Sequence, residues 1–562
     1  MITRRDFLTA TSAAALLTAS GGSLRQAAAQ GRLTQSELLK FDSVGNVTLV
    51  HLTDLHGQLM PLYFREPSIN IGVGENKGVV PHITGDAFLD AFKLQRRSAA
   101  AHALTYNDFA ELARSYGRMG GLDRIATVVK AIRAERDGKM LLLDGGDTWT
   151  NSWTSHKTNG QDMVDCMATL KPDAMTAHWE FTLGEARVKE LTANLGFPLL
   201  AQNVKDKEFE DPAFPAQEMF ERGGVKIAVI GQALPFTPIA NPRWMIPNWT
   251  FGIREREMQK EVDTAKAAGA DLVVLLSHNG FDVDRKLASR VEGIDVILTA
   301  HTHDALPRPE RVKKTLLIAS GSHTKFLSRL DIEVEHGRVK EFSYALIPLL
   351  ADAITPDPVM AKLIDDIRAP HEAMLRTPLS HAGGLLYRRG NVAGTLDDMI
   401  CDALLSERDA EICFSPGFRW GNSLIEGDPI TWDDVYNATA LTYPAVYRIP
   451  FSGETIKTVL EDVADNLFNV DPYYQQGGDM VRVGGMSFAI HVDKPMGQRI
   501  TDMTHLKSGQ PIEPSREYVV AGWASVNEGT EGPPIWDVVA NHLRKHPTIA
   551  GKSHETVRIV RG

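Results

Sequence analysis

The feature that most constrains the fold is a series of short apolar runs, most of which end in an acidic residue or a histidine. Between residues 47 and 350 they alternate with segments of helical periodicity such as GGLDRIATVVKAIRAE. The runs read VTLVHLTDLHG, MLLLDGGDTW, VKIAVIGQAL, DLVVLLSHNG and IDVILTAHTHD. This alternation predicts a layered α/β domain. Several runs are apolar on successive residues, as expected of central strands covered on both faces.

The polar residues that follow these runs are candidate metal ligands. Functional groups in open α/β sheets gather just beyond the carboxyl ends of the strands. Two pairs stand two residues apart, which places both members on one side of an extended chain. One aspartate follows DGG, whose glycines allow the backbone to approach a ligand closely. The seven candidates are Asp54, His56, Asp147, His178, His278, His301 and His303.

Seven groups exceed the needs of one ion, so we expect two ions that share Asp147. Asp54, His56 and His303 would complete one set of four, and His178, His278 and His301 the other. Mixed oxygen and nitrogen donors without thiolate fit manganese, zinc or iron. Water held by two such ions becomes a hydroxide nucleophile near neutral pH. Any one of these residues alone would be read as structural, a strand-end histidine or a helix cap, so the metal hypothesis depends on their number.

The texture of the sequence changes after residue 350. A proline-containing stretch and an amphipathic helix mark a boundary there. We therefore expect the α/β domain at residues 30–350, a linker helix at 351–378 and a smaller α+β domain at 379–562. An insertion at 60–119, rich in glycine and proline and with one helix near 86–103, is expected to form a lid or rim on the first loop.

Residues 1–29 carry the paired Arg4 and Arg5, a short apolar stretch and small residues at Ala27 to Ala29. This order is similar to a twin-arginine export signal that is cut near Ala29, and an ordinary amphipathic helix is the alternative. The export signal predicts a periplasmic location. Folded proteins with an inserted metal or cofactor often take this route, which agrees with the metal hypothesis.

Bulk properties exclude several classes of protein. The formal net charge of −11 argues against nucleic-acid binding. Beyond the N-terminus no uncharged apolar run reaches the ~18 residues of a membrane span, so no membrane association is expected. The three cysteines, Cys166, Cys401 and Cys413, form no CxxC pair and are expected to be buried thiols, although the sequence leaves a Cys401–Cys413 disulfide open.

The stretches DLHG, GGLDRIATVVKAIR, LLLDGGDTW, SHNG and AHTHD resemble the metal motifs of the calcineurin-like metallophosphoesterases, in the order found in the 5'-nucleotidase group. The C-terminal stretch SPGFRWGNSLIEGDPITWDDVYNATALTYPAVYRIPFSGETI is similar to the substrate domain of that group. The resemblance implies a four-layer α/β/β/α sandwich with a two-metal hydrolytic site. It covers nearly the whole chain after residue 29.

One motif departs from this group. The nucleotidase pattern is Gly-Asn-His-Glu-Phe-Asp, in which Asn binds metal, His acts on the leaving group and Asp orients that His. Here His178 replaces the Asn ligand, and Trp179 and Thr182 replace both members of the acid pair. Positioned acid catalysis contributes a factor of about 10² to 10⁴. Its loss would cripple a nucleotidase but not an enzyme whose leaving group is a weakly basic sulfur anion, and an indole suits a sulfur chain.

The HWEFT sequence and the long insertion after DLHGQ resemble the thiosulfohydrolase family of the periplasmic Sox sulfur-oxidation system. That resemblance implies a dimanganese enzyme, with zinc or iron possible at the same ligands. It implies attack by metal-bound hydroxide, without a histidine acid, on a cysteine-S-thiosulfonate of the SoxYZ carrier protein, which releases sulfate. Asp147 and His178 would serve catalysis as ligands, and we expect a monomer.

Three further residues are predicted to serve the substrate. Arg419 matches an anion-binding arginine of the related substrate domain, and its alternative role is an ion pair. Trp179 would line the sulfur channel, with simple packing as the alternative. Asn279, beside His278, would donate a hydrogen bond near the substrate.

Two other functions remain open. A periplasmic 5'-nucleotidase or cyclic-nucleotide phosphodiesterase would keep the fold and ligands but leave Trp179 and Thr182 unexplained. A non-catalytic, metal-dependent protein that binds an oxyanion or the carrier would explain the lost acid, but not the retention of all seven ligands.

Overall fold

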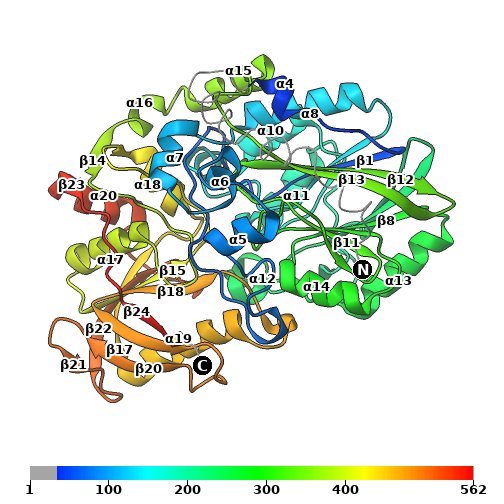
Figure 1. Cartoon of the computed structure of the whole chain (residues 1–562). Helices are drawn as coiled ribbons and strands as arrows, with labels where there is room; N and C mark the ends of the chain where they lie inside the picture. Colours follow the sequence, from blue (N-terminus) through cyan, green and yellow to red (C-terminus); the bar gives the residue numbers. More distant parts are fainter. Residues whose placement is uncertain (1–33, 561–562) are drawn as a thin grey trace. The chain divides into compact units, whose positions relative to one another are not determined.

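The computed structural model describes residues 34–560, so the predicted export signal lies outside the described residues. The chain divides into two compact units (Figure 1). Unit 1 contains the described residues up to Leu62, together with Phe88–Thr150 and Thr154–Arg368. Unit 2 contains Tyr63–Ala87, Asn151–Trp153 and the chain from Ala369 onwards. Among residues 34–560, none of the helices combines the length and apolar character needed to cross a lipid bilayer.

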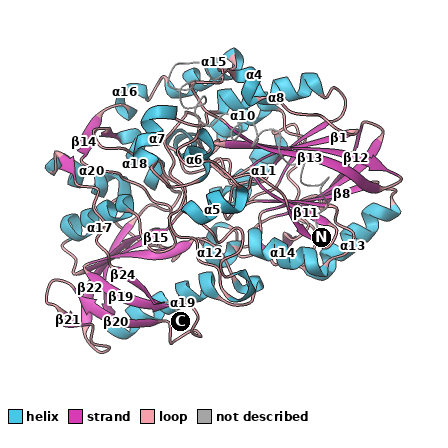
Figure 2. Cartoon of the chain, in the orientation of Figure 1, coloured by secondary structure: helices cyan, strands magenta, loops and turns pink. Residues whose placement is uncertain are grey.

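Unit 1 is built on two β-sheets (Figure 2). The five-stranded sheet has the order β13 (Arg338–Pro348), β12 (Phe326–Glu335), β1 (Val47–Leu52), β2 (Met140–Asp144) and β3 (Ala174–Met175). The six-stranded sheet has the order β10 (Glu310–Val312), β11 (Thr315–Ala319), β9 (Val296–Thr299), β8 (Leu272–Ser277), β6 (Val225–Gln232) and β5 (Gln217–Arg222). A small pair joins β4 (Lys205–Asp206) and β7 (Trp249–Thr250).

The central strands are buried along their whole length, as their apolar runs predict. Every residue of β1, β2, β8 and β9 is buried. Strands β1 and β2 pair in parallel, as do β6 with β8 and β8 with β9. Parallel neighbours require crossover connections, which cover the sheets with helices. The α/β prediction is therefore confirmed, and the two sheets with their helices form the four-layer α/β/β/α sandwich.

Helices α13 (Glu255–Ala267) and α14 (Phe281–Arg290) pack on strands of the six-stranded sheet. Helix α15 (Pro358–Arg368) packs against α8 (Leu122–Glu135) and α10 (Gln161–Leu170). The helices of unit 1 are α4 (Gln35–Leu38), α6 (Ala99–Leu104), α7 (Phe109–Tyr116), α8 (Leu122–Glu135), α10 (Gln161–Leu170), α11 (Glu185–Ala193), α12 (Thr237–Ala240), α13 (Glu255–Ala267), α14 (Phe281–Arg290) and α15 (Pro358–Arg368), with the 3₁₀ turns η2 (Trp179–Leu183) and η3 (Arg243–Met245). Two more, α5 (Gly85–Phe92) and α9 (Trp153–Thr158), span junctions between the units.

The prediction of a single helix near residues 86–103 is wrong in the number of helices. The structure has two helices there, α5 and α6. Lys93 and Arg97 adopt left-handed backbone angles, with φ of 56° and 59°, which a continuous α-helix does not allow. Ser98 then accepts the Ala101 N–H at 3.2 Å and begins α6 as its cap.

Unit 2 is an α+β structure with three sheets. These are β16 (Pro429–Thr431), β14 (Pro378–Ala382) and β23 (Thr548–Ile549); then β17 (Val446–Ser452), β22 (Glu517–Trp523), β15 (Ile412–Gly417) and β18 (Asp479–Gly484); then β21 (Gln510–Pro511), β20 (Ile500–His505), β19 (Met486–His491) and β24 (Val557–Val560). Its helical segments are α16 (Glu372–Leu375), α17 (Thr395–Arg408), α18 (Trp432–Thr439), α19 (Gly453–Phe468), α20 (Ile535–Lys545), η1 (Gly74–Asn76) and η4 (Pro472–Tyr474). All three cysteines of the chain are buried and unlinked.

The first part of the predicted insertion, Tyr63–Ala87, belongs to unit 2, and we call it the excursion. Its apolar residues Ile69, Ile71 and Val73 pack with the core of unit 2. Glu66 in the excursion forms a buried ion pair with Arg389, with Oε2 and Nη1 2.9 Å apart. Unit 2 is therefore completed by a segment that lies some 300 residues earlier in the chain than Ala369.

Removing methyl groups from the excursion should destabilise unit 2. Val73 is 4% exposed and belongs to the core that includes Phe414 and Phe488. We expect Val73→Ala to lower the free energy of unfolding by about 2 kcal/mol, because it removes buried carbons and leaves a cavity. Calorimetric unfolding measures this. Val79→Ala, at a site that is 44% exposed in the same segment, is the control and should change little; equal effects would contradict the packing.

Candidate metal centre

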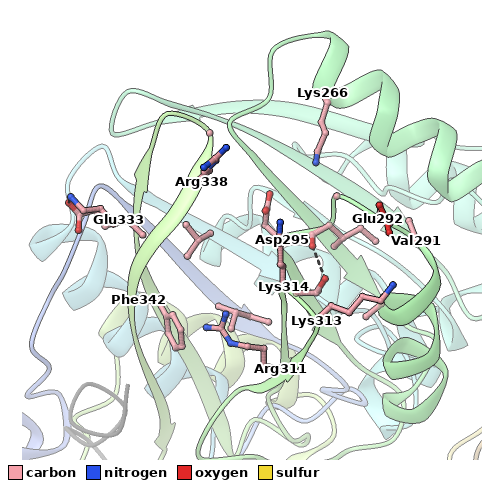
Figure 3. A pocket seen from close by; sticks show the side chains of 18 of the residues that line it. Lys266, Val291, Glu292, Asp295, Arg311, Lys313, Lys314, Glu333, Arg338 and Phe342 are labelled. Atoms are coloured by element: carbon pink, nitrogen blue, oxygen red, sulfur yellow. Dashed lines mark hydrogen bonds and ion pairs between the residues drawn. The ribbon is translucent and has the colours of Figure 1, made fainter. Parts of the chain in front are cut away.

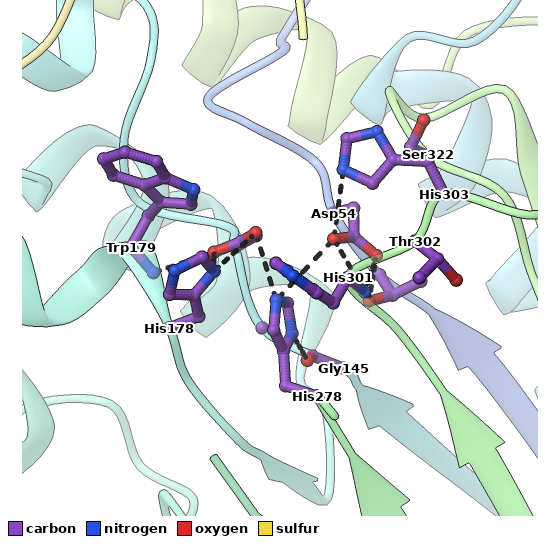
Figure 4. A network of polar contacts seen from close by, with 12 residues as sticks. Asp54, Gly145, His178, Trp179, His278, His301, Thr302, His303 and Ser322 are labelled. Atoms are coloured by element: carbon purple, nitrogen blue, oxygen red, sulfur yellow. Dashed lines mark hydrogen bonds and ion pairs between the residues drawn. The ribbon is translucent and has the colours of Figure 1, made fainter. Parts of the chain in front are cut away.

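The structure brings all seven candidate ligands together at the carboxyl ends of five strands of unit 1. Figure 4 labels five of them, Asp54, His178, His278, His301 and His303. They form two groups of four that share Asp147, and none is more than 9% exposed. In each group the potential ligand atoms lie within 4.8 Å of one another. The groups are Asp54, His56, Asp147 and His303, and Asp147, His178, His278 and His301.

The separations of the donor atoms fit bound cations. His56 Nε2 and His303 Nε2 face each other at 3.0 Å, and His303 Nε2 lies 3.3 Å from Asp54 Oδ1. In the other group, Asp147 Oδ2 lies 3.1 Å from His278 Nε2 and 3.2 Å from His178 Nδ1. Imidazole lone pairs and carboxylate oxygens that converge in a buried space are the usual ligands of zinc, manganese or iron. The donor set is therefore suited to two divalent cations.

Five of the seven ligands adopt left-handed backbone angles. The φ values are 52° at Asp54, 50° at His56, 58° at Asp147, 73° at His301 and 59° at His303. Such angles cost free energy for residues other than glycine and persist where the surroundings enforce them. The loops after β1, β2 and β9 are thus held in strained backbone conformations that position the ligand side chains.

A buried carboxylate, Glu180, holds two of these loops together. Its Oε1 accepts the N–H groups of Thr148 at 2.6 Å and Trp149 at 3.3 Å. Its Oε2 accepts those of His178 at 2.8 Å and Asp147 at 3.3 Å. Glu180 is 0% exposed, so these backbone donors have no water to bond instead. The residue therefore fixes the relative position of the shared ligand and of His178.

Burial and mutual attraction set the protonation of the ligands. Considering the protein groups alone, burial raises the pKa of Asp54 to about 8. Burial also opposes ionisation of Asp147, but His178 and His278 outweigh it and hold the pKa of Asp147 well below its usual range. Burial disfavours the charged form of His278, yet Asp147 reverses this and raises the pKa of His278 to about 10. Protons thus occupy places that a cation would take.

Trp179 lies beside the shared ligand, and its backbone N–H donates to Asp147 Oδ1 at 2.8 Å. Its indole is 6% exposed, and its ring centroid lies 5.3 Å from that of His178. Thr182 Oγ1 donates to the carbonyl of Trp179 at 2.8 Å, so its hydroxyl serves the turn η2. Within η2 these two side chains supply neither an imidazole nor a carboxylate, the groups that the acid pair would need.

The two remaining predicted residues form hydrogen bonds to groups outside the two ligand sets. The Asn279 side chain donates to Asp284 Oδ1 of α14 at 2.8 Å and accepts from Gln232 Nε2, at the end of β6, at 3.0 Å. Arg419 belongs to unit 2, where its Nη2 donates to the Gly478 carbonyl at 2.5 Å and its Nε lies 3.8 Å from Asp479 Oδ1. Both residues have structural partners in their own unit.

Reasoning from the sequence missed three residues beside the ligands. Glu180 was read only as part of a motif, and nothing in its spacing revealed its four backbone donors. His323 is 1% exposed, with its ring 5.3 Å from that of His56 and 5.7 Å from that of His303. Asn241 Oδ1 lies 3.1 Å from His178 Nε2. The GSH sequence after β11 was a signal for His323, whereas Asn241 follows no strand.

A cleft of about 1690 Å³ lies at the opposite edge of the sheets (Figure 3). It opens near Asp295 and Thr315, which stand at the starts of β9 and β11, whereas the ligands follow strand ends. Its lining mixes cations such as Arg311 and Lys314 with acids such as Glu292. Neither potential metal group of the described residues lies there, so we place the chemistry at the ligand cluster.

Comparisons with known proteins agree with this geometry. The model of the 5'-nucleotidase C-terminal domain matches residues 382–540. Rat 5'-nucleotidase is 23% identical over 478 residues, which cover 76% of this chain and 80% of the rat protein. The solved sulfate thiohydrolase SoxB of Thermus thermophilus is 37% identical with a TM-score of 0.89, and the match covers 93% of this chain and 98% of that one. A 5'-nucleotidase precursor of the same organism, 19% identical with a TM-score of 0.72, shares the fold over 92% and 99% of the two chains.

The sandwich, the shared-carboxylate cluster and the C-terminal domain together define a hydrolase of the 5'-nucleotidase and metallophosphoesterase superfamily. Within this superfamily, the 37% sequence identity and the TM-score of 0.89 to the Thermus SoxB, over nearly the whole of both chains, identify the family. The chain belongs to the SoxB family.

Replacing the carboxylate that joins the two ligand loops should loosen the metal centre. In Glu180→Gln an amide NH₂ would face backbone N–H groups that need an acceptor. We expect the free energy of unfolding to fall by roughly 2–4 kcal/mol and manganese affinity to fall with it. Chemical unfolding and metal titration measure the two effects. Glu190→Gln, at a side chain that is 62% exposed, is the control, and an unchanged Glu180→Gln would reject this role.

Manganese affinity should rise with pH. Asp54, with a pKa of about 8, and His278, with a pKa of about 10, carry protons near neutral pH that a cation must displace. The apparent affinity therefore falls on acidification from pH 8 to pH 6. Calorimetric titration in two buffers of different ionisation enthalpy counts the released protons.

Asp54→Asn is the matched variant for this measurement, because its amide cannot release a proton. It should lower the number of released protons by about one. An affinity independent of pH in the unmodified protein would contradict the expectation.

Proposed function

We propose that this chain is a thiosulfohydrolase that removes the terminal sulfonate of a cysteine-S-thiosulfonate carried by the SoxYZ protein and releases sulfate. One observation carries the proposal: seven ligands of a two-metal site are assembled, while Trp179 and Thr182 stand where a phosphate esterase needs an acid pair. The 37% identity to a solved SoxB supports the same reading.

The chemistry of the leaving group explains this combination. In the proposed step a water oxygen attacks the sulfonate sulfur, and the S–S bond breaks with its electron pair moving to the carrier's sulfur. The products are sulfate, two protons and a persulfide anion on the carrier cysteine. A persulfide is weakly basic, so no acid must protonate it in the transition state. A ribose alkoxide would need that proton, and its delivery is worth a factor of about 10² to 10⁴.

The chain's own residues then have distinct tasks. Asp147 is the shared ligand, and the N–H of Trp179 orients its carboxylate. The seven ligands would hold two manganese ions, which supply the positive charge that activates water and binds sulfonate oxygens. The indole of Trp179 would offer the persulfide an apolar neighbour, and Arg419 would bind sulfonate oxygens as a planar cation. Asn279, through Gln232 and Asp284, would support the loop that carries His278.

The setting of the reaction is part of the proposal. The twin-arginine pattern at residues 1–29 supports export to the periplasm, where a carrier-borne substrate would be met. We propose a monomer that contacts the carrier and neither nucleic acid nor membrane. The net charge of −11 supports the part of this proposal that excludes nucleic acid.

Sulfate release tests the proposal directly. Manganese-loaded protein is mixed with a carrier peptide that bears a cysteine-S-thiosulfonate, and AMP hydrolysis is measured in parallel. We expect rapid sulfate release and negligible phosphate release, because Trp179 and Thr182 cannot protonate a ribose oxygen. Asp147→Asn is the inactive control, since it weakens the shared ligand of both ions.

Two outcomes would overturn the assignment. Phosphate release without sulfate release would make the chain a nucleotidase, the activity after which relatives such as the rat protein are named. A tight complex with the loaded carrier that never turns over would make it a binding protein.

A further inference from the structure

His178 is a histidine where the nucleotidase pattern has an asparagine, and its ring has a second nitrogen that needs a partner. Nδ1 faces Asp147 Oδ2 at 3.2 Å, on the side of the metal cluster. Nε2 points the other way and lies 3.1 Å from Asn241 Oδ1.

The direction of this hydrogen bond follows from the ring. If Nδ1 offers its lone pair to a cation, Nε2 carries the ring proton and donates it to Asn241 Oδ1. His278 is oriented in the same way with the nitrogens exchanged, since its Nδ1 donates to the Gly145 carbonyl at 2.6 Å and its Nε2 faces Asp147. Each histidine therefore has one ring nitrogen fixed by a partner and the other free for metal.

Asn241 is itself poorly satisfied, which singles it out. It is 3% exposed, and its Nδ2 has no hydrogen-bond partner among the described residues. A buried amide N–H without a partner destabilises a fold. The residue is therefore explained by the bond that Oδ1 makes to His178 and not by its own contribution to stability.

The segment that carries Asn241 is tied to the loop of His178. The Leu234 N–H donates to the carbonyl of Ala177, the residue before His178, at 3.2 Å. The Asn241 N–H donates to the Thr237 carbonyl at 3.0 Å and ends α12. Pro242 follows directly, which restricts the backbone of Asn241 to extended angles. These contacts fix the position of Asn241 relative to the imidazole of His178.

We propose that Asn241 is a positioning residue of the metal centre, which fixes the tautomer of His178 and so makes Nδ1 the metal-facing nitrogen. The inference rests on the metal centre of the proposed function and is independent of its substrate. It assigns Asn241 to one of the two ions, the one held by Asp147, His178, His278 and His301.

Metal titration of the full chain tests this role. Calorimetry with Mn²⁺ is run on the unmodified protein and on Asn241→Leu, Asn241→Asp and Asn203→Leu. We expect Asn241→Leu to weaken one of the two binding events by about 10- to 100-fold and to change the other by less than about threefold. Asn241→Asp should restore binding, because a carboxylate also accepts the Nε2 proton.

Asn203 is the matched control for a purely structural effect. It is 0% exposed, and its side chain bonds to the backbone of Ala233 and Gly252. Asn203→Leu should lower the melting temperature and leave both affinities unchanged. If Asn241→Leu fails to fold, Asn241→Ala is titrated in its place with the same expectation.

A spectroscopic measurement reports the tautomer without any assay of activity. In zinc-loaded protein labelled with ¹⁵N-histidine, the Nε2–H of His178 should give a slowly exchanging resonance, assigned by its loss in His178→Gln. The resonance should persist in Asn241→Asp and disappear in Asn241→Leu. Loss of sulfate release with this pattern intact would reject the substrate assignment and support the role of Asn241.

Two results would overturn the proposal. One is an Asn241→Leu variant that binds both ions like the unmodified protein and keeps the His178 resonance. The other is an Asn203→Leu variant that loses the same binding event, since the effect would then follow from general destabilisation.

Discussion

The contact on which the rest of the structure depends is the one between Asp147 and its neighbours. A carboxylate this deeply buried is tolerated only where positive charge or hydrogen-bond donors surround it. Asp147 receives both, from two imidazoles and from the Trp179 N–H, and the protein adds the ionisable Asp54 nearby. Two carboxylates and five imidazoles in one buried space form an arrangement that bound cations complete. The sandwich places them there because its strands end at one edge.

Glu180 and Asn241 show how such a cluster is kept in order. Neither belongs to the ligand groups, yet one binds the backbone of two ligand loops and the other faces the far side of a ligand ring. The left-handed backbone angles of five ligands indicate that the surrounding structure holds these loops in strained conformations. Strained ligand loops on a sandwich of buried strands are consistent with a site that is shaped for function at some expense of stability.

The strand-end residues could be predicted from the sequence because burial, strand direction and position along the chain coincide there. His278 directly follows the six-residue strand β8, so its position at the edge of the sheet could be predicted from the sequence. Asn241 and Glu180 could not be predicted, since their roles depend on which backbone groups and ring atoms face them after folding. The break between α5 and α6 could not be predicted either, because lysine and arginine are not residues that typically signal the left-handed backbone angles found at Lys93 and Arg97. The metal preference and the carrier lie outside what spacing alone can determine.

The excursion has a consequence for how the second unit can be inherited or engineered. The chain passes between the units five times, and two of those passages follow closely on the ligands Asp147 and His56. A fragment that starts at Ala369 would lack both Val73 and Glu66. It would therefore lose apolar packing in the core of unit 2 and one buried ion pair of Arg389. Unit 2 is consequently not a cassette. Exchanging unit 2 among related hydrolases would require grafting the excursion as well, and the excursion begins only a few residues after the ligand His56.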